Sequence, residues 1–408
     1  MKEWKEYKAT DFCTNVTDGT HDSPKPKAEG HYLITSKHLQ NNVIDFSSAY
    51  RISEEDYMRV IQRSRVEQFD ILFSMIGTIG NTVRVVSPEV DFAVKNMAIF
   101  KMGQNDLKSK WLYYWLKSST AKAYISSRLA GSTQSYLTLD ALRNFPIYAP
   151  DERAMQGITD ILSSIDDKIE LNNRINHNLE EQAQALYKSW FVDFEPFKGG
   201  KFVDSELGMI PKGWRVLPFL SVARLCSGGT PKTDQKEFWN GSIPFFTPKD
   251  VGDSAFCLST EKTITEEGLK NCNSSLYKAF TTFITARGTV GKLCMAGVPM
   301  AMNQTNYAIC PASNIDVITL FLITKQLINS LRNKANGAVF DAITTRDFDG
   351  EKVTIAPQGV MDTFSSVVHP IYESILQNEM KNASLSQLRD SLLPKLMSGD
   401  FITSDIPC

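Results

Sequence analysis

The chain has 408 residues, of which 42% are hydrophobic and 22% are charged, and this composition excludes a wholly disordered protein. Its 44 Lys and Arg against 46 Asp and Glu give a formal net charge of −2, which excludes a uniformly basic DNA-coating protein but allows a local basic face. No apolar stretch approaches the roughly 20 residues of a membrane helix. The first residues lack the apolar core of a signal peptide, so we expect a cytoplasmic protein of several domains.

The first 149 residues have the pattern of a mixed α/β domain. Short apolar runs such as Ile71-Leu72-Phe73 are separated by Gly, Pro and Asn, as in short strands joined by turns. A helix is expected near 107–128. Pro150 then opens a long helix whose apolar residues alternate at spacings of three and four, the pattern of a coiled-coil seam. These residues are Ile158, Leu162, Ile165, Ile169, Leu179, Ala183 and Leu186.

A Pro- and Gly-containing connector at 195–213 leads to a second region with the same plan. Mixed α/β sequence covers 214–356, with a helix expected at 315–334, and Pro357 opens a second long helix. Its seam residues are Phe364, Val368, Ile371, Ile375, Leu385 and Leu392.

The two regions are an internal repeat. Trp4, Gly77-Thr78-Ile79-Gly80 and Asp193-Phe194 recur as Trp214, Gly288-Thr289-Val290-Gly291 and Asp400-Phe401, at offsets of 206–212. The predicted organisation is two domains (1–149 and 214–356), two long helices (150–194 and 357–401), the connector at 195–213 and a tail at 402–408. Because the second repeat ends where the first begins, we expect Phe401 to lie near Trp4.

Two asparagines interrupt each seam: Asn172 and Asn176 in the first helix, and Asn378 and Asn382 in the second. If the helices pair antiparallel, the midpoints of the two seams place Asn172 opposite Asn378. A buried polar layer of this kind fixes the register of a coiled coil. The alternative, in which these residues face solvent at a break in the seam, stays open.

The sequence predicts no catalytic site. The stretch Gly288-Thr289-Val290-Gly291-Lys292 lacks the spacing of a phosphate-binding loop, and no dinucleotide, zinc-protease or nucleophile-elbow motif is present. Neither an Asn-Pro-Pro-aromatic nor an Asp-Pro-Pro-aromatic element is found, so an amino-methyltransferase site is missing. Cys and His are scattered without metal-site spacing, and we expect no structural metal.

Polar, Gly-containing loops recur at matching places in both regions and have the composition of DNA contacts. Lys and Arg neutralise phosphates, whereas Asn, Gln, Arg and Thr can read base edges. We expect Lys37 and Lys249 to contact phosphates, and the whole candidate set is Thr20, His21, Lys25, Lys37, His38, Thr78, Asn81, Arg128, Gln134, Thr230, Lys232, Lys249, Arg287, Thr289, Lys292, Gln304, Arg332 and Asn336. For any one loop, an ordinary solvated turn is the alternative.

Four stretches together resemble the specificity subunit of type I restriction–modification systems. They are ILSSIDDKI at 161–169, ALYKSWF at 185–191, LGMIPKGW at 207–214 and LLPKLMSG at 392–399. The resemblance implies two α/β target-recognition domains joined by two long antiparallel coiled-coil helices. It implies a subunit without catalysis, in which each domain reads one half of a bipartite DNA target.

The resemblance also implies partners. The helices would set the spacing of the half-sites and dock two methylation subunits, with Trp190, Phe191, Leu396 and the seam asparagines as candidate docking and register residues. A restriction subunit joins where present; S-adenosylmethionine, ATP and Mg²⁺ belong to these partners. The competing interpretation is a tandem glycan- or protein-binding module on a coiled-coil scaffold.

Overall fold

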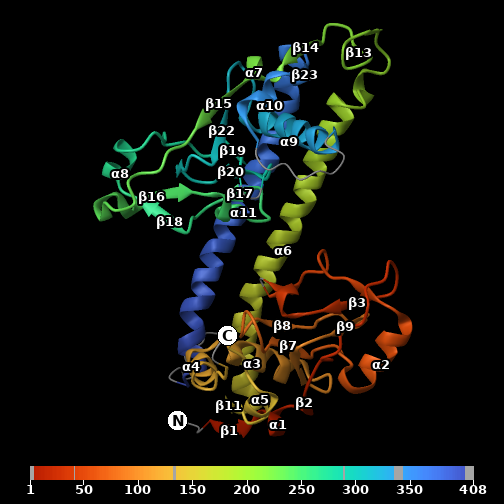
Figure 1. Ribbon diagram of the computed structural model, residues 1–408, viewed down its shortest axis with the longest axis vertical. Helices are drawn as coiled ribbons and strands as arrows, with labels where there is room; N and C mark the ends of the chain where they lie inside the picture. Colours follow the sequence, from red (N-terminus) through yellow and green to blue (C-terminus); the bar gives the residue numbers. More distant parts are fainter. Residues whose placement is uncertain (1–3, 41, 132–134, 288–289, 335–342, 400–408) are drawn as a thin grey trace. The chain divides into compact units, whose positions relative to one another are not determined.

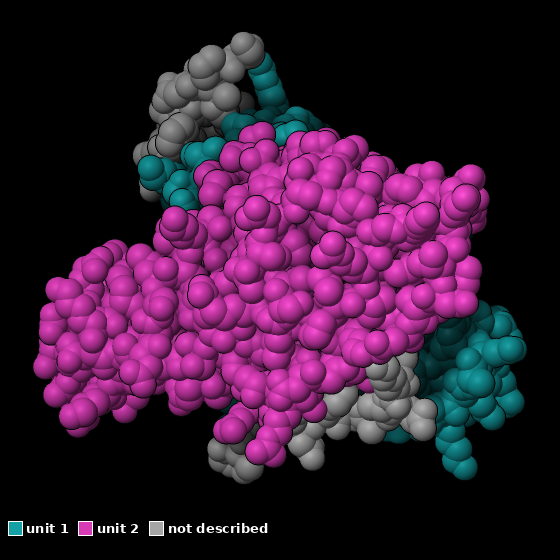
Figure 2. Space-filling view, turned by 90° about the horizontal axis from the view of Figure 1, so that it is seen from above, with its two compact units in different colours: residues 1–168, 385–408 teal, residues 169–384 magenta. Residues whose placement is uncertain are grey.

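The computed structural model describes residues 4–40, 42–131, 135–287, 290–334 and 343–399. The chain divides into two compact units, which Figure 2 distinguishes by colour: unit 1 is residues 1–168 with 385–408, and unit 2 is residues 169–384. Each unit therefore consists of one α/β domain together with a stretch of each long helix, α6 (Glu152–Phe191) and α11 (Gln358–Met397). The division predicted from the sequence instead assigns these helices to segments of their own, separate from the two domains.

Unit 1 is built from short strands and helices (Figure 1). Its strands are β1 (Lys5–Lys8), β2 (Asn15–Asp18), β3 (His31–Ile34), β4 (Leu39–Gln40), β5 (Val43–Ile44), β6 (Arg51–Ile52), β7 (Ile71–Ser74), β8 (Thr82–Arg84), β9 (Phe92–Val94), β10 (Met97–Lys101) and β11 (Pro146–Ala149). Its helices besides the long pair are α1 (Ala9–Phe12), η1 (Ser36–His38), α2 (Glu54–Ser64), α3 (Asp106–Lys117), α4 (Ser119–Ser127) and α5 (Leu139–Arg143).

Two sheets form the centre of unit 1. The first has the antiparallel order β2-β10-β7-β8, and the second has the order β6-β3-β9, in which β3 and β9 are parallel. Ile71, Phe73 and Phe100 of the first sheet pack in one core with Trp111 and Leu112 of α3. The other sheet faces enclose a second core that includes Leu72, Ile99 and Val94. Burial of these apolar strands holds the loops at the strand ends in place.

Unit 2 repeats this plan. Its strands are β12 (Phe202–Val203), β13 (Ile210–Pro211), β14 (Arg215–Pro218), β15 (Ala223–Ser227), β16 (Trp239–Phe246), β17 (Phe256–Cys257), β18 (Lys262–Ile264), β19 (Thr282–Thr285), β20 (Leu293–Ala296), β21 (Ala301–Met302), β22 (Asn306–Pro311) and β23 (Lys352–Ile355). Its shorter helices are η2 (Glu195–Phe197), α7 (Phe219–Val222), η3 (Lys236–Phe238), η4 (Pro248–Asp250), α8 (Glu266–Lys270), α9 (Val317–Lys334) and α10 (Thr345–Asp349).

The sheets of unit 2 have corresponding orders. The larger is β15-β22-β19-β20-β17, and the smaller is β18-β16-β21, in which β16 and β21 are parallel. The pairing of β14 with β23 matches that of β1 with β11 in unit 1. The two domains therefore share one topology, as the internal repeat predicts, and both are mixed α/β.

One predicted helix differs from the structure. The helix expected at 107–128 is divided into α3 and α4 at Ser118, whose Oγ accepts a hydrogen bond from the Ala121 N–H (3.2 Å). The Ser118 N–H donates to the Trp115 carbonyl, so this serine closes one helix and caps the next. Serine at such a position favours a new N-terminus over a continuous helix.

In unit 1, α6 and α11 pack through the predicted seam. α6 begins after Pro150, where an Asp151 carboxylate oxygen accepts from the Ala154 N–H (2.9 Å). Ile158 and Leu162 are buried in one core, and the half-buried Leu392 packs against it. The Asp166 carboxylate also accepts hydrogen bonds from Arg389 of α11 (2.7 Å) and from the Tyr114 hydroxyl of α3 (2.8 Å).

In unit 2, the two long helices run antiparallel and are joined by their asparagines. The Asn172 amide donates to the Asn382 Oδ1 (2.7 Å), and the Asn378 amide donates to the Asn176 Oδ1 (2.9 Å). Asn172, Asn176 and Asn382 are buried, and Asn378 is half-buried. The predicted pairing of Asn172 with Asn378 is therefore wrong by four residues, about one helical turn.

The end of α11 lies beside the start of the chain in unit 1. A Cβ built on Gly399 would meet the Trp4 indole at 3.2 Å. Phe401, which we expected near Trp4, lies outside the described residues. Within the described ranges, no helix is long and apolar enough to cross a membrane.

Candidate nucleic-acid interface

The predicted polar loops of unit 1 gather where the parallel strands β3 and β9 end. Thr35–His38 directly follow β3, and Lys95 and Asn96 directly follow β9. The Lys95 N–H donates to the Ile34 carbonyl, and the Asn96 N–H donates to the Thr20 carbonyl (3.1 Å). We call residues 18–23, 35–38, 75–81 and 95–96 the loop edge of unit 1. Carboxyl ends of parallel strands meet at one edge of a sheet, which explains this clustering of distant segments.

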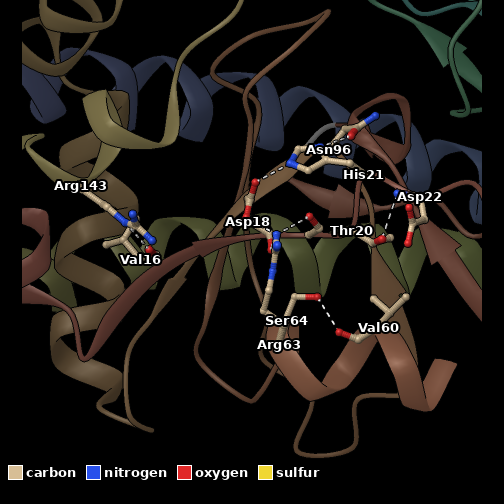
Figure 3. Close-up of polar contacts among 11 residues, drawn as sticks. Val16, Asp18, Thr20, His21, Asp22, Val60, Arg63, Ser64, Asn96 and Arg143 are labelled. Atoms are coloured by element: carbon tan, nitrogen blue, oxygen red, sulfur yellow. Dashed lines mark hydrogen bonds and ion pairs between the residues drawn. The ribbon is translucent and has the colours of Figure 1, made fainter. Parts of the chain in front are cut away.

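Side-chain hydrogen bonds among Asp18, His21, Arg63 and Asn96, which we call the clasp of unit 1, join two of these loops (Figure 3). His21, the third residue after β2, contacts the Asn96 Oδ1 through Nδ1 (2.9 Å) and the Asp18 carboxylate through Nε2 (2.8 Å). Arg63 of α2 donates to the other oxygen of Asp18 (2.6 Å). Asn96 has φ of 55°, a left-handed conformation that asparagine tolerates better than most residues. The clasp holds His21 at the exposed surface.

Unit 2 has a clasp at the equivalent place, made of different side chains. Thr230, the third residue after β15, donates through its hydroxyl to the Gln304 Oε1. Gln304 is the second residue after β21, as Asn96 is after β9. A Cβ on Gly228 would lie 2.3 Å from the Met302 carbonyl oxygen, so the loop can approach β21 only with glycine there. The loop edge of unit 2 comprises residues 227–230, 247–250, 286–287, 290–292 and 303–304.

Lys37 and Lys249 occupy the same exposed position in two equivalent turns. Each is the central residue of a 3₁₀ turn, η1 or η4, that begins with a threonine capping box. In η4 the Asp250 carboxylate accepts from the Thr247 N–H (2.7 Å). Both lysine side chains are exposed, as a phosphate contact requires.

His38 does not face solvent, contrary to expectation. Its side chain is 0% exposed, and its Nδ1 accepts from the Thr35 N–H (2.9 Å), so it takes the capping role that Asp250 has in η4. Burial, together with the charge on Lys37, lowers the pKa of His38. This residue shapes the turn that presents Lys37.

The β7–β8 hairpin brings two further candidates to the edge of unit 1. Thr78 is exposed, and the Asn81 amide donates to the Leu39 carbonyl (2.7 Å) just beyond η1. Exposed Arg128 precedes the segment that is anchored to this hairpin by the pairing of Tyr136 with Ile76. Gln134 lies outside the described residues.

The matching hairpin of unit 2 carries Arg287 and Lys292, both exposed. The Ala286 N–H donates to the Thr305 carbonyl (3.0 Å), which ties this loop to the segment after β21. Lys25 and Lys232 are exposed farther along the loops that begin at the clasps. Thr289 and Asn336 lie outside the described residues, as does the side chain of Arg332.

The candidate docking residues have a core role in this structure. Phe191 is buried against Phe364 and Trp214, and Leu396 is buried in the core of unit 1. Trp190 is half-buried between Phe197 and Phe364. The side chains of Phe191 and Leu396 are therefore inaccessible to a partner in this conformation.

Sequence reasoning missed three members of the unit 1 clasp. Asp18 lies in the same polar loop as His21, three residues before it, whereas Arg63 is 45 residues from Asp18 and Asn96 is 75 residues from His21. A local signal for Asn96 was its place in a short Lys-Asn turn between two apolar strands. Among the described residues, no group of three or more His, Cys, Asp or Glu could hold a metal ion.

The two repeated domains match one family model, described as the type I restriction modification DNA specificity domain, over residues 1–181 and 211–373. The chain belongs to this family. It is the DNA specificity subunit of a type I restriction–modification system. The family match decides between the two interpretations that the sequence had left open.

The individual proteins to which this chain is similar are also specificity subunits. The type I restriction enzyme MjaIX specificity subunit of Methanocaldococcus jannaschii is 30% identical over 73% of this chain and 70% of its own length. The HindI specificity subunit of Haemophilus influenzae is 24% identical over 98% of this chain and all of its own (100%). The crystal structure of an S subunit from M. genitalium shares the fold, with a TM-score of 0.57, 15% identity and 96% coverage of both chains.

Proposed function

We propose that each domain of this specificity subunit reads one half of a bipartite double-stranded DNA target through its loop edge. The observation that carries the proposal is the pair of clasps. The same position in the same fold holds His21 with Asn96 in one domain and Thr230 with Gln304 in the other. A shared frame that presents different hydrogen-bonding groups suits two modules that read two different sequences.

The long helices and the partners complete the proposal. α6 and α11 set the distance between the two half-sites and dock two methylation subunits, which carry S-adenosylmethionine. A restriction subunit, where the system has one, supplies the ATP- and Mg²⁺-dependent steps. The antiparallel contacts of α6 with α11, seen within each unit, support a stiff spacer.

The test uses the chain co-expressed with its methylation subunits in a host whose DNA is otherwise unmethylated. Sequencing that detects methylated bases then gives the recognised sequence, which we expect to consist of two short parts separated by a gap. A target with one continuous part, or no sequence preference, would contradict the proposal.

Matched clasp variants then assign the domains. His21→Ala with Asn96→Ala is expected to relax the base preference in one half of the target, and Thr230→Ala with Gln304→Ala in the other half. Loss of a good base contact costs about 1–3 kcal/mol, so discrimination at the affected position should fall roughly 5- to 150-fold. Either pair altering both halves equally would show that the domains do not read separately.

A further inference from the structure

A pair of arginines extends the loop edge of unit 1 onto α2. Arg59 and Arg63 are four residues apart and therefore lie on one face of this helix (Figure 3 shows Arg63). The adjoining face packs on the β6-β3-β9 sheet through Val60, which is buried in one cluster with Leu33, Ile52 and Ala93. The buried face fixes the helix, so the arginines keep their place beside Thr20 and His21.

The arginines line a hollow at the surface. Its volume is about 280 Å³, and it is lined by Thr20, His21, Asp22, Arg59, Val60, Arg63 and Ser64. A second hollow, of about 210 Å³, is also lined by Arg63 and includes Arg65 and Lys101. Arg63 therefore lines both hollows.

One nitrogen of each guanidinium is held by a carboxylate, and most of each arginine side chain is exposed. Arg63 uses Nη2 for Asp18 (2.6 Å), and Arg59 uses Nη2 for Asp56 (2.5 Å). The side chains are 62% and 61% exposed. Such pairs orient a guanidinium while leaving donors in its planar fork for an oxyanion. Asp22 adds one negative charge to the rim of the hollow.

Unit 2 has no arginine pair at the corresponding helix. α8 is five residues long, and its sequence is Glu-Glu-Gly-Leu-Lys, with Lys270 as its one basic residue. α2 has eleven residues and includes both arginines. The two domains share topology but differ in charge at this place.

We propose that Arg59 and Arg63 form a phosphate-binding site that grips the DNA backbone beside the half-site read by unit 1. The inference rests on the proposed function and adds an asymmetry to it, because α8 offers no equivalent grip. Phosphate contacts position a protein on DNA without reading sequence. The Arg59–Arg63 site therefore contributes to affinity and to its salt dependence, and leaves the recognised sequence unchanged.

The experiment measures binding of the complex with its methylation subunits to a duplex that carries the mapped target, by fluorescence anisotropy between about 50 and 200 mM salt. Each lost phosphate contact lowers the slope of log Kd against log salt by roughly 0.9. Arg59→Gln with Arg63→Gln should therefore lower the slope by about 1.8. Between those salt concentrations, the affinity advantage of the unsubstituted protein should shrink about tenfold.

Three further variants separate charge from folding. Arg59→Lys with Arg63→Lys keeps both charges and should retain the slope. Asp22→Asn removes a repulsive charge and should tighten binding at low salt. Lys270→Gln on α8 is the matched control and should leave DNA-backbone protection of the unit 1 half-site unchanged in hydroxyl-radical footprinting. The double Gln variant should lose backbone protection at that half-site.

The outcomes are distinguishable. Absence of sequence preference in the unsubstituted complex would overturn the proposed function. Sequence-specific binding with an unchanged salt slope in the double Gln variant would overturn the phosphate site alone. A double Lys variant whose slope of log Kd against log salt falls as far as that of the double Gln variant would also count against the phosphate site. So would an Asp22→Asn variant that binds DNA more weakly.

Discussion

At the scale of single residues, His31 links three elements of unit 1. It lies in β3, and its ring stacks on Tyr57 of α2 with 3.8 Å between centroids. Its Nε2 contacts the Glu54 carboxylate of α2 (2.5 Å), and its Nδ1 contacts Asp91 just before β9. Although desolvation opposes protonation, the hydrogen bonds to Glu54 and Asp91 raise the pKa of His31. The protonated ring thus fastens α2 to the sheet.

This arrangement predicts a pH-dependent stability. A pKa raised in the folded state means that the stabilisation is complete below the unfolded pKa and is lost as pH rises through the folded pKa. Partly exposed ion pairs contribute about 0.2–1 kcal/mol each. His31→Gln should therefore lower the Tm at pH 6, and the difference from the unsubstituted protein should shrink in alkaline buffer. His177→Gln, which alters an exposed ring on α6, is the control; a His31→Gln effect that grows with pH would refute the assignment.

At the scale of elements, the sequence predicted the long helices well and their register poorly. The apolar 3-4 spacing identifies which face of each helix packs, and those residues are buried or half-buried. A slide of four residues, however, keeps the same faces together in an antiparallel pair. Periodicity therefore cannot distinguish Asn378 from Asn382 as the partner of Asn172. The structure identifies Asn382, whose Oδ1 accepts a hydrogen bond from the Asn172 amide at 2.7 Å.

The register predicts an asymmetric response to substitution. Asn172→Leu leaves the buried Asn382 Oδ1 without its donor and should cost about 1–3 kcal/mol. Adding Asn382→Leu removes the orphaned group and should restore or exceed the starting Tm, measured by circular dichroism. Asn178→Leu on the exposed face should change stability by less than about 0.5 kcal/mol. A double variant less stable than Asn172→Leu would contradict the observed pairing.

At the scale of the whole molecule, the repeat predicted the common topology of the two domains. It predicted the repeated turns of the candidate site but not the side chains that the fold brings to them. The repeat pointed to Lys37 and Lys249, because each is the third residue of a matching turn that begins with threonine. The same argument failed for His38, since a histidine that caps a turn looks in sequence like one that faces a ligand. Arg63 and Asn96 could not be predicted, because the fold brings them to Asp18 and His21 from 45 and 75 residues away. Asp18 lies only three residues before His21, but nothing in the loop sequence marks it as the partner of that histidine.

The proposed spacer role of the helices gives a prediction for the whole subunit. Seven residues inserted between Lys168 and Ile169 and seven between Ser384 and Leu385 fall where the two compact units divide. They preserve the seam, because its period is seven, and lengthen both helices by about 10 Å. At about 3.4 Å per base pair, the gap between half-sites should grow by about three base pairs, with both half-sites unchanged. Methylated-base sequencing measures the gap directly. Insertion into α6 alone shifts the seam against its partner and should lower the Tm; an unaltered gap after the paired insertion would refute the spacer role.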